Sequence, residues 1–227
     1  DAGATASAEA DAAATGEGPD ATLAPGLGLA HRYEVVRRIG RGGMGEVYEV
    51  FDLALRERVA LKVVRPALAG DRGVMERFQR EIHLSRRVTH PNVCRVFDLG
   101  RHRDGRRDVT FLTMELLDGE TLEARLRRGG RLKAEEALPL VRQMADALDA
   151  AHAAGVVHRD FKPANVMLVP AREGGTRVVV TDFGLARSLE PDGEAVGVSS
   201  GRFAVGTAGD MAPEQAHGSG APRASAG

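Results

Sequence analysis

The sequence predicts an α+β protein in which a small β-rich part is followed by a mainly helical part. Up to about residue 114, short apolar runs rich in β-branched residues alternate with turn-forming residues, which is typical of strands. After the Asp118-Gly119 turn, apolar residues recur at three- and four-residue spacings, which indicates helices with one buried face. Because 227 residues with 43% hydrophobic side chains can bury a sizeable core, we expect a folded protein.

Five strands and one helix are expected in the first part. The predicted strands cover residues 33–39, 46–51, 59–64, 93–99 and 109–114. A glycine-rich turn joins the first two strands, so these two should form a hairpin. Between the third and fourth strands, Val74, Phe78 and Ile82 follow the period of a helix and predict one over residues 74–88.

The second part should contain two helices and a pair of short strands. The helices are predicted over residues 121–128 and 134–154, and the longer one ends at Gly155. Its buried face is a stripe formed by Ala137, Leu140, Val141, Met144, Leu148 and Ala151. The two strands follow, over residues 166–169 and 178–181.

Both ends of the chain differ in composition from the middle. Residues 1–30 contain five acidic side chains, no Lys or Arg and few large apolar groups, so we expect a disordered tail there. Residues 218–227 are small and polar, and we expect a flexible end. The β-rich lobe then occupies residues 31–117 and the helical lobe residues 118–217.

Composition also excludes several kinds of partner. Outside the acidic tail, 31 basic residues stand against 27 acidic ones, and so small an excess does not predict binding to nucleic acid. No run approaches the roughly 18 apolar residues of a membrane helix, so we expect no membrane segment and a cytoplasmic location, although a parent protein could be anchored beyond residue 227. The single cysteine, Cys94, lies in an apolar run and is expected to be a buried strand residue.

The turn of the predicted hairpin carries the first chemical motif. It reads Gly40-Arg41-Gly42-Gly43-Met44-Gly45-Glu46-Val47 and matches the pattern G-x-G-x-x-G-x-V. Glycines let the backbone approach phosphates closely and present N–H groups to their oxygens. A dinucleotide-binding motif of similar spacing would lead into a helix, whereas this loop joins two strands. Taken alone, the motif also fits an ordinary structural hairpin.

Lys62 is the second candidate, because it stands inside the apolar run Val59-Ala60-Leu61-Lys62. Side chains alternate between the two faces of a strand, so a surface lysine with a buried stem remains one interpretation. The functional interpretation gives the ammonium group a phosphate and an acidic partner. Glu81, on the following helix, is the candidate for that partner.

The most specific motif follows the long helix. Residues 158–165 read His-Arg-Asp-Phe-Lys-Pro-Ala-Asn and place Asp160, Lys162 and Asn165 within six positions. Phosphoryl transfer to a hydroxyl needs a carboxylate that accepts the proton, a cation near the transferred group and an oxygen ligand for a metal. Those three types of side chain are present. Asp182, after the last predicted strand, adds a carboxylate that could bind magnesium.

The order and spacing of these motifs, with Ala212-Pro213-Glu214 near the end, resemble the protein kinase family. The glycine motif and Lys162-Pro163-Ala164-Asn165 are similar in amino-acid sequence to the corresponding motifs of bacterial, eukaryotic-like serine/threonine protein kinases. The resemblance covers roughly residues 33–217 and implies a two-lobed protein-kinase-like fold. It has a small antiparallel β lobe with one helix and a mainly helical large lobe, which we expect to be incomplete and C-terminally truncated in this chain.

The resemblance also implies an ATP site between the two lobes. The glycine loop would cover the nucleotide, Met114 would stand at the back of the pocket as the gatekeeper, and the backbone of residues 115–117 would bind the adenine edge. The residues that would contact ATP are Ile39, Gly40, Gly42, Gly43, Gly45, Val47, Ala60, Lys62, Met114, Glu115, Leu117 and Met167.

Catalytic roles are implied in the same way. Asp160 would be the catalytic base and Lys162 would steady the γ-phosphate. Lys62 would hold the α- and β-phosphates while paired with Glu81, and Mg²⁺ would be bound by Asn165 and Asp182. Lys162 at its position in this loop implies serine/threonine rather than tyrosine specificity.

The resemblance further implies regulation and partners. Arg159, next to the catalytic base, would clamp a phosphate on the following loop, where Ser199 and Ser200 are candidate phosphorylation sites. Simple solvation of these serines remains the other interpretation. Thr207 would contact Asp160 from the substrate-binding loop. The expected substrates are proteins with Ser or Thr acceptors, and autophosphorylation is expected too.

The sequence departs from the family pattern before Ala212-Pro213-Glu214, where the segment 206–210 lacks the usual proline and aromatic residue. This departure and the expected truncation leave alternatives open. The first function is a serine/threonine protein kinase, and the sequence leaves open whether this fragment is itself active or inactive. The second is a non-catalytic, ATP-binding, pseudokinase-like scaffold module. A small-molecule phosphotransferase is disfavoured by the Ala-Pro-Glu triplet and the long loop before it.

Overall fold

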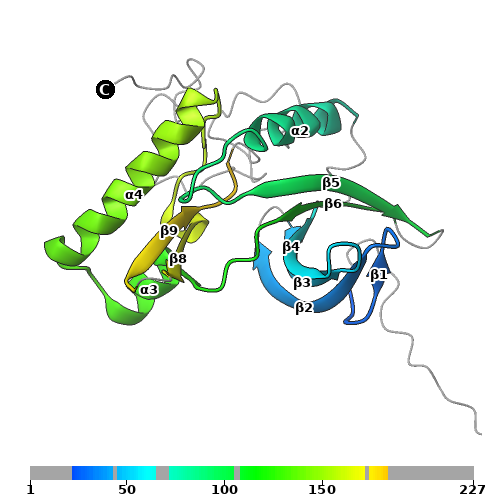
Figure 1. The fold of residues 1–227 in the computed structure, drawn as a ribbon, viewed down its shortest axis with the longest axis horizontal. Helices are drawn as coiled ribbons and strands as arrows, with labels where there is room; N and C mark the ends of the chain where they lie inside the picture. Colours follow the sequence, from blue (N-terminus) through cyan, green and yellow to red (C-terminus); the bar gives the residue numbers. More distant parts are fainter. Residues whose placement is uncertain (1–21, 43–44, 65–71, 105–107, 172–173, 184–227) are drawn as a thin grey trace, which may run out of the picture.

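Six antiparallel strands form the sheet of the first part, in the order β1-β2-β3-β4-β6-β5. The structure is a computed structural model and describes residues 22–42, 45–64, 72–104, 108–171 and 174–183. The strands are β1 (Gly28–Leu29), β2 (Tyr33–Gly42), β3 (Gly45–Asp52), β4 (Glu57–Val63), β5 (Val96–Arg103) and β6 (Asp108–Met114). Figure 1 shows this sheet on one side of the molecule, and α3, α4, β8 and β9 on the other.

The sheet is held by an apolar core on one face and by a helix on the other. On the first face, Tyr48, Val50 and Leu61 are fully buried, and the ring of Tyr33 packs edge-on against Phe111 at 5.7 Å. Helix α2 (Arg72–Ser85) lies over β5, as Figure 1 shows, and buries its apolar stripe there. Burial of each such side chain contributes about 1.5–3 kcal/mol.

Residues 22–30 belong to this folded part, which corrects the disordered tail expected over residues 1–30. Strand β1 pairs with β2, and Leu23 and Leu29 are 5% and 0% exposed. The N–H of Leu23 donates to the hydroxyl of Tyr48 at 2.9 Å, and burial raises the pKa of Tyr48 to about 12. Three leucines among small residues, at positions 23, 27 and 29, show no helical periodicity and make no strand-like run, so the sequence pattern did not reveal this segment.

The second part combines two helices with a small sheet. Strands β7 (Glu120–Thr121), β8 (Val166–Pro170) and β9 (Thr176–Val180) form an antiparallel sheet in that order. The helices are α3 (Leu122–Gly129) and α4 (Ala134–Ala153), and a 3₁₀ turn, η1 (Pro163–Asn165), precedes β8. The hydroxyl of Thr121 accepts a hydrogen bond from the N–H of Ala124 at 3.0 Å, which caps α3.

A short segment, residues 90–95, begins with a turn and connects the two parts. Val93 forms a parallel bridge with Val180 of β9, and the N–H of Cys94 donates to the carbonyl of Val180 at 2.9 Å. The side chain of Asn92 donates to Gln143 of α4. Because this segment pairs with β9, the strand expected at residues 93–99 begins in the first sheet only at Val96.

The α+β class and the protein-kinase-like arrangement are confirmed, and the remaining predicted elements are present with bounds shifted by a few residues. Cys94 is buried as expected, although in the joining segment rather than in a strand. Among the described residues, none of the helices is both long and apolar enough to cross a bilayer.

The turn at Gly119 gives a test of this packing. An added Cβ at Gly119 would lie 2.2 Å from the carbonyl oxygen of Leu168, so the backbone of β8 would have to move. We expect Gly119→Ala to lower the free energy of unfolding by about 1–3 kcal/mol in urea titrations. Gly28→Ala is the control, because a Cβ there meets nothing within 4 Å. Equal midpoints for the two variants would contradict this packing.

Candidate active site

The glycine motif forms the tight end of the β2–β3 hairpin. Gly40 faces Val47 and Gly42 faces Gly45 in the register of the two strands. Gly45 has a φ of 142°, a backbone conformation that side chains with a Cβ rarely adopt. Ile39 of β2 is 39% exposed, so its apolar side chain is accessible from solvent. Gly43 lies outside the described residues.

The residues expected around the adenine come together at the junction of the two parts. Ala60 of β4 is paired in register with Met114 of β6, and Ala60 is 3% exposed. Met114, Leu117 and Met167 pack against one apolar cluster that also contains Cys94. Burial raises the pKa of the Cys94 thiol, which therefore stays protonated and packs as an apolar group.

The loop between α4 and β8 holds the expected catalytic side chains in contact. Lys162 Nζ lies 2.8 Å from Asp160 Oδ2. The amide nitrogen of Asn165 donates to the carbonyl of Asp160 at 2.8 Å and to its Oδ2 at 3.1 Å. The side chain of Asp160 is 7% exposed, so these contacts fix the direction of its carboxylate. One carboxylate, one cation and one amide thus share a single small site.

Hydrogen bonds to Thr181 bring Asp182 to this loop. A ring nitrogen of His158 and the carbonyl of Thr181 lie 2.9 Å apart, and the N–H of Thr181 donates to the carbonyl of Asn165 at 2.9 Å. The ring of His158 also packs on Phe183 with 4.6 Å between centroids. Burial lowers the pKa of His158, so its imidazole is neutral near pH 7.

Two ion pairs cross the junction, and they differ from the expected pair of Lys62 with Glu81. Lys62 Nζ lies 2.7 Å from Asp182 Oδ1, and the side chain of Lys62 is 8% exposed. Glu81 Oε1 lies 2.9 Å from a guanidinium nitrogen of Arg159. The sequence could not show which carboxylate Lys62 contacts. Glu81 and Asp182 are both within reach of a cation, and only the placement of α2 decides between them.

The donor set of this site fits a magnesium ion. Because the amide nitrogen of Asn165 is the donor to Asp160, its Oδ1 is the atom that a cation would contact. Together with the carboxylate of Asp182 it offers the hard oxygen ligands that Mg²⁺ prefers. Within the described ranges, there is no group of three or more His, Cys, Asp or Glu side chains that could hold a metal ion. Two protein ligands leave coordination positions for phosphate oxygens and water.

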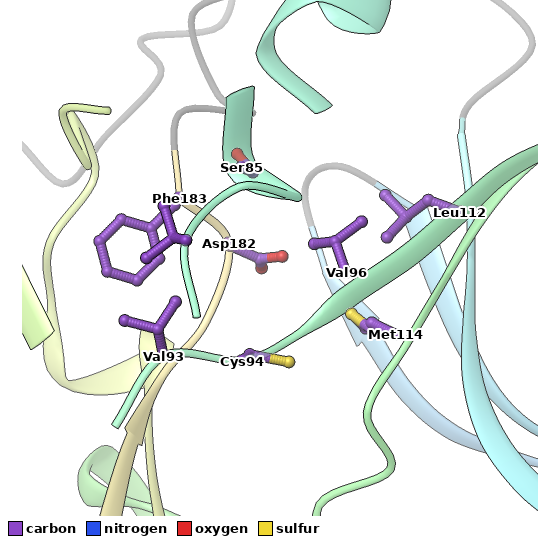
Figure 2. A pocket seen from close by; sticks show the side chains of 9 residues that line it. Ser85, Val93, Cys94, Val96, Leu112, Met114, Asp182 and Phe183 are labelled. Carbon is purple, nitrogen blue, oxygen red and sulfur yellow. The ribbon is translucent and has the colours of Figure 1, made fainter. Parts of the chain in front are cut away.

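A small cavity of about 20 Å³ lies behind Met114. Figure 2 shows Asp182 and Phe183 on one side of it and Val96, Leu112 and Met114 on the other, with Ser85 at one end. Ser85 is 7% exposed, and its hydroxyl has no hydrogen-bond partner among the described residues. A volume of this size holds about one water molecule.

The comparisons with known proteins agree with this geometry. Residues 33–225 match the protein kinase domain model. The chain belongs to the protein kinase family. It is 40% identical over 201 residues to the serine/threonine-protein kinase PknA of Mycobacterium tuberculosis and 39% identical over 201 residues to the serine/threonine-protein kinase pkn3 of Myxococcus xanthus. The match covers 88% of this chain in both cases, but only 45% and 36% of those proteins.

Solved structures give the same result for the fold. A crystal structure of the Mycobacterium tuberculosis PknI kinase domain matches with a TM-score of 0.62 and 39% sequence identity. The match covers 73% of this chain and 64% of that domain. The motif residues from Gly40 to Asp182 that the structure describes are therefore placed in the fold that their order predicted, whereas Ala212-Pro213-Glu214 lies outside the described residues.

Some site residues escaped the sequence prediction, and others cannot be placed. Ser85 was not predicted, because a lone serine near the end of a helical pattern carries no signal of burial. Arg177, which contacts Glu115, was also missed. The regulatory candidates Ser199, Ser200 and Thr207 lie outside the described residues, so their roles stay predictions.

Ser85 gives a test of the cavity. Because a buried hydroxyl without a partner costs about 1–3 kcal/mol, we expect Ser85→Ala to leave the free energy of unfolding unchanged or to raise it by about 1 kcal/mol. Thr113→Val is the control, since the buried Thr113 hydroxyl donates to the carbonyl of Asp98 at 3.5 Å and its loss should destabilise. A loss of stability in Ser85→Ala, measured by chemical denaturation, would contradict the unpaired hydroxyl.

The buried imidazole of His158 predicts a pH dependence of stability. Its pKa is lower in the folded than in the unfolded protein, so the unfolded state takes up the proton first as the pH falls. We therefore expect stability to decrease below the unfolded pKa of about 6.5. Melting temperatures at pH 7.5 and 5.5 should differ more for the unaltered protein than for His158→Phe. The same pH dependence in both proteins would refute this assignment.

Proposed function

We propose that this chain is the catalytic part of a serine/threonine protein kinase, which transfers the γ-phosphate of ATP to hydroxyl groups of protein substrates. The observation that carries the proposal is the contact of Lys62 with Asp182 across the junction, beside the Asp160, Lys162 and Asn165 cluster. Three separate parts of the sequence supply these residues, around residue 62, over residues 160–165 and at residue 182, and each part has a side chain that phosphoryl transfer needs.

The catalytic cluster divides the work of the reaction. The carboxylate of Asp160 orients the acceptor hydroxyl and takes its proton, and the contact with Asn165 holds that carboxylate in one direction. Lys162, at 2.8 Å from Asp160, places positive charge next to the transferred phosphoryl group. The presence of Lys162 at this position also supports Ser or Thr as acceptors, because the family resemblance links this lysine to serine/threonine specificity.

The nucleotide would lie between the glycine hairpin and the cluster around Met114, Leu117 and Met167. This apolar cluster would pack against the adenine ring, and the hairpin backbone would provide N–H groups for phosphate oxygens. Mg²⁺ held by Asn165 and Asp182 would neutralise negative charge on the phosphates. Lys62 is already at the edge of this site, where its ammonium group can exchange Asp182 for a phosphate.

The ion pair between Glu81 and Arg159 suggests a resting arrangement of the site. With Glu81 on Arg159, the partner that the family resemblance gives to Lys62 is engaged elsewhere. A phosphate on Ser199 or Ser200 would compete for the guanidinium group of Arg159 and release Glu81 for Lys62. This route links autophosphorylation to an active arrangement. Like the protein substrates and a cytoplasmic location, it remains a proposal.

The alternative of a non-catalytic ATP-binding scaffold is supported by the same ion pairs, since they hold the site away from the expected Lys62–Glu81 arrangement. The filled catalytic positions favour the enzyme. The two functions differ in one property, which is transfer of phosphate in addition to binding of nucleotide.

Transfer of radiolabelled phosphate from ATP to a generic basic protein and to the chain itself tests the enzyme. We expect Asp160→Asn to reduce transfer by about a hundredfold or more, because it removes the general base. The control is Asp149→Asn, which changes an exposed carboxylate on α4 and should leave transfer unchanged. Thermal stabilisation by ATP and Mg²⁺ without any transfer in the unaltered protein would refute the enzyme and favour the scaffold.

A further inference from the structure

The side chain of Arg177, on β9, joins three segments at the back of the junction. One guanidinium nitrogen donates to the carbonyl of Pro91 at 3.1 Å. A second guanidinium nitrogen, Nη2, donates to Glu115 Oε1 at 2.7 Å. Pro91 lies in the segment that joins the two parts, and Glu115 directly follows the last residue of β6. The side chains of Arg177 and Glu115 are 33% and 29% exposed, so water reaches the pair only in part.

Two of these three segments are fixed to each other. The amide nitrogen of Asn92 donates to the carbonyl of Val178 at 2.7 Å and to Gln143 Oε1 at 2.9 Å. The same Gln143 oxygen accepts the N–H of Val178 at 2.9 Å, and the Gln143 nitrogen donates to the carbonyl of Thr176 at 3.1 Å. The loop at Pro91, helix α4 and strand β9 therefore behave as one body.

Glu115, the residue that Arg177 contacts, does not belong to this rigid body. It begins the segment of residues 115–119, which crosses from β6 of the first sheet to β7 of the second. Its N–H donates to the carbonyl of Arg95 at 2.9 Å, and its own carbonyl faces the thiol of Cys94. Its backbone is therefore at the edge of the apolar cluster proposed to hold adenine.

We propose that Arg177 is a positioning residue for the nucleotide. It ties the side chain of Glu115 to the rigid body of the second part, and so fixes the backbone of residues 115–117 where adenine would bind. An arginine suits this role because its planar fork serves two acceptors in different directions, which a lysine cannot do equally well. The inference rests on the proposed function, since it assumes that ATP binds at this junction.

A positioning role predicts a change in affinity rather than in the chemical step. Loss of a partly exposed ion pair weakens the favoured placement of the segment, which corresponds to about a two- to fivefold loss of affinity. Neither Arg177 nor Glu115 contacts the Asp160 cluster in the hydrogen bonds and ion pairs of the described residues. The value of kcat should therefore stay within about twofold of that of the unaltered protein, while KM for ATP rises.

The test compares Arg177→Gln with Arg177→Lys and with a matched control, Arg101→Gln. Arg101 pairs with Asp108 at 2.6 Å in the β5–β6 hairpin, away from residue 115. Calorimetry with a non-hydrolysable ATP analogue and Mg²⁺ gives Kd, and melting temperatures without nucleotide report stability. We expect a two- to fivefold higher Kd for Arg177→Gln, a smaller rise for Arg177→Lys and no change for Arg101→Gln. A lower melting temperature with unchanged Kd would show a structural role only and overturn the proposal.

A double-mutant cycle tests whether Arg177 acts through Glu115. If it does, Arg177→Gln combined with Glu115→Ala should raise Kd no more than either single change does. Additive effects would overturn the proposal. If the unaltered protein does not bind the analogue at all, the proposed function fails. If it binds and Arg177→Gln binds equally well, only the role of Arg177 fails.

Discussion

The hydrogen bonds of Thr181 are the interaction on which the site depends. Its carbonyl meets the imidazole of His158, and its N–H donates to the carbonyl of Asn165. The first bond joins a side chain to the backbone and the second joins two backbone groups, and burial lowers the pKa of the His158 imidazole and keeps it neutral. They fix the end of β9 to the catalytic loop, so Asp182 stands next to Asn165 without a direct bond between the two side chains. Backbone geometry thus places together the two side chains that we propose as ligands for magnesium.

The junction of the two parts combines a rigid side with an adjustable side. On the rigid side, residues 90–95 pair with β9. The side chains of Asn92 and Gln143 form hydrogen bonds with the backbone of β9 and with each other. On the adjustable side, Lys62, Asp182, Glu81 and Arg159 form two ion pairs that can exchange partners. Because the side chain of Lys62 is only 8% exposed, it can leave Asp182 at low cost only when another anion takes the place of that carboxylate. A phosphate or a magnesium ion can therefore decide the arrangement.

Packing around Met114 shows how the same residues serve the fold and the site. Met114 pairs with Ala60 in the sheet, borders the apolar cluster with Leu117 and Met167, and lines the small cavity with Ser85. Phe183 and Asp182 line the same cavity, and the ring of Phe183 packs against His158 with 4.6 Å between centroids. The packing around Met114 is therefore next to the carboxylate that we propose for metal binding.

The sequence alone determined the class of fold, the order along the chain of all strands and helices except β1 and β7, and the motif that contains Asp160, Lys162 and Asn165. These depend on local periodicity and on short motifs, which the chain carries whatever its partners are. Tertiary structure decided what depends on distance between separated segments: Glu81 on Arg159, Arg177 on Glu115, and the burial of Leu23 and Ser85. No local pattern records which of several charges within reach a side chain will meet, because that choice depends on how the helices and sheets pack.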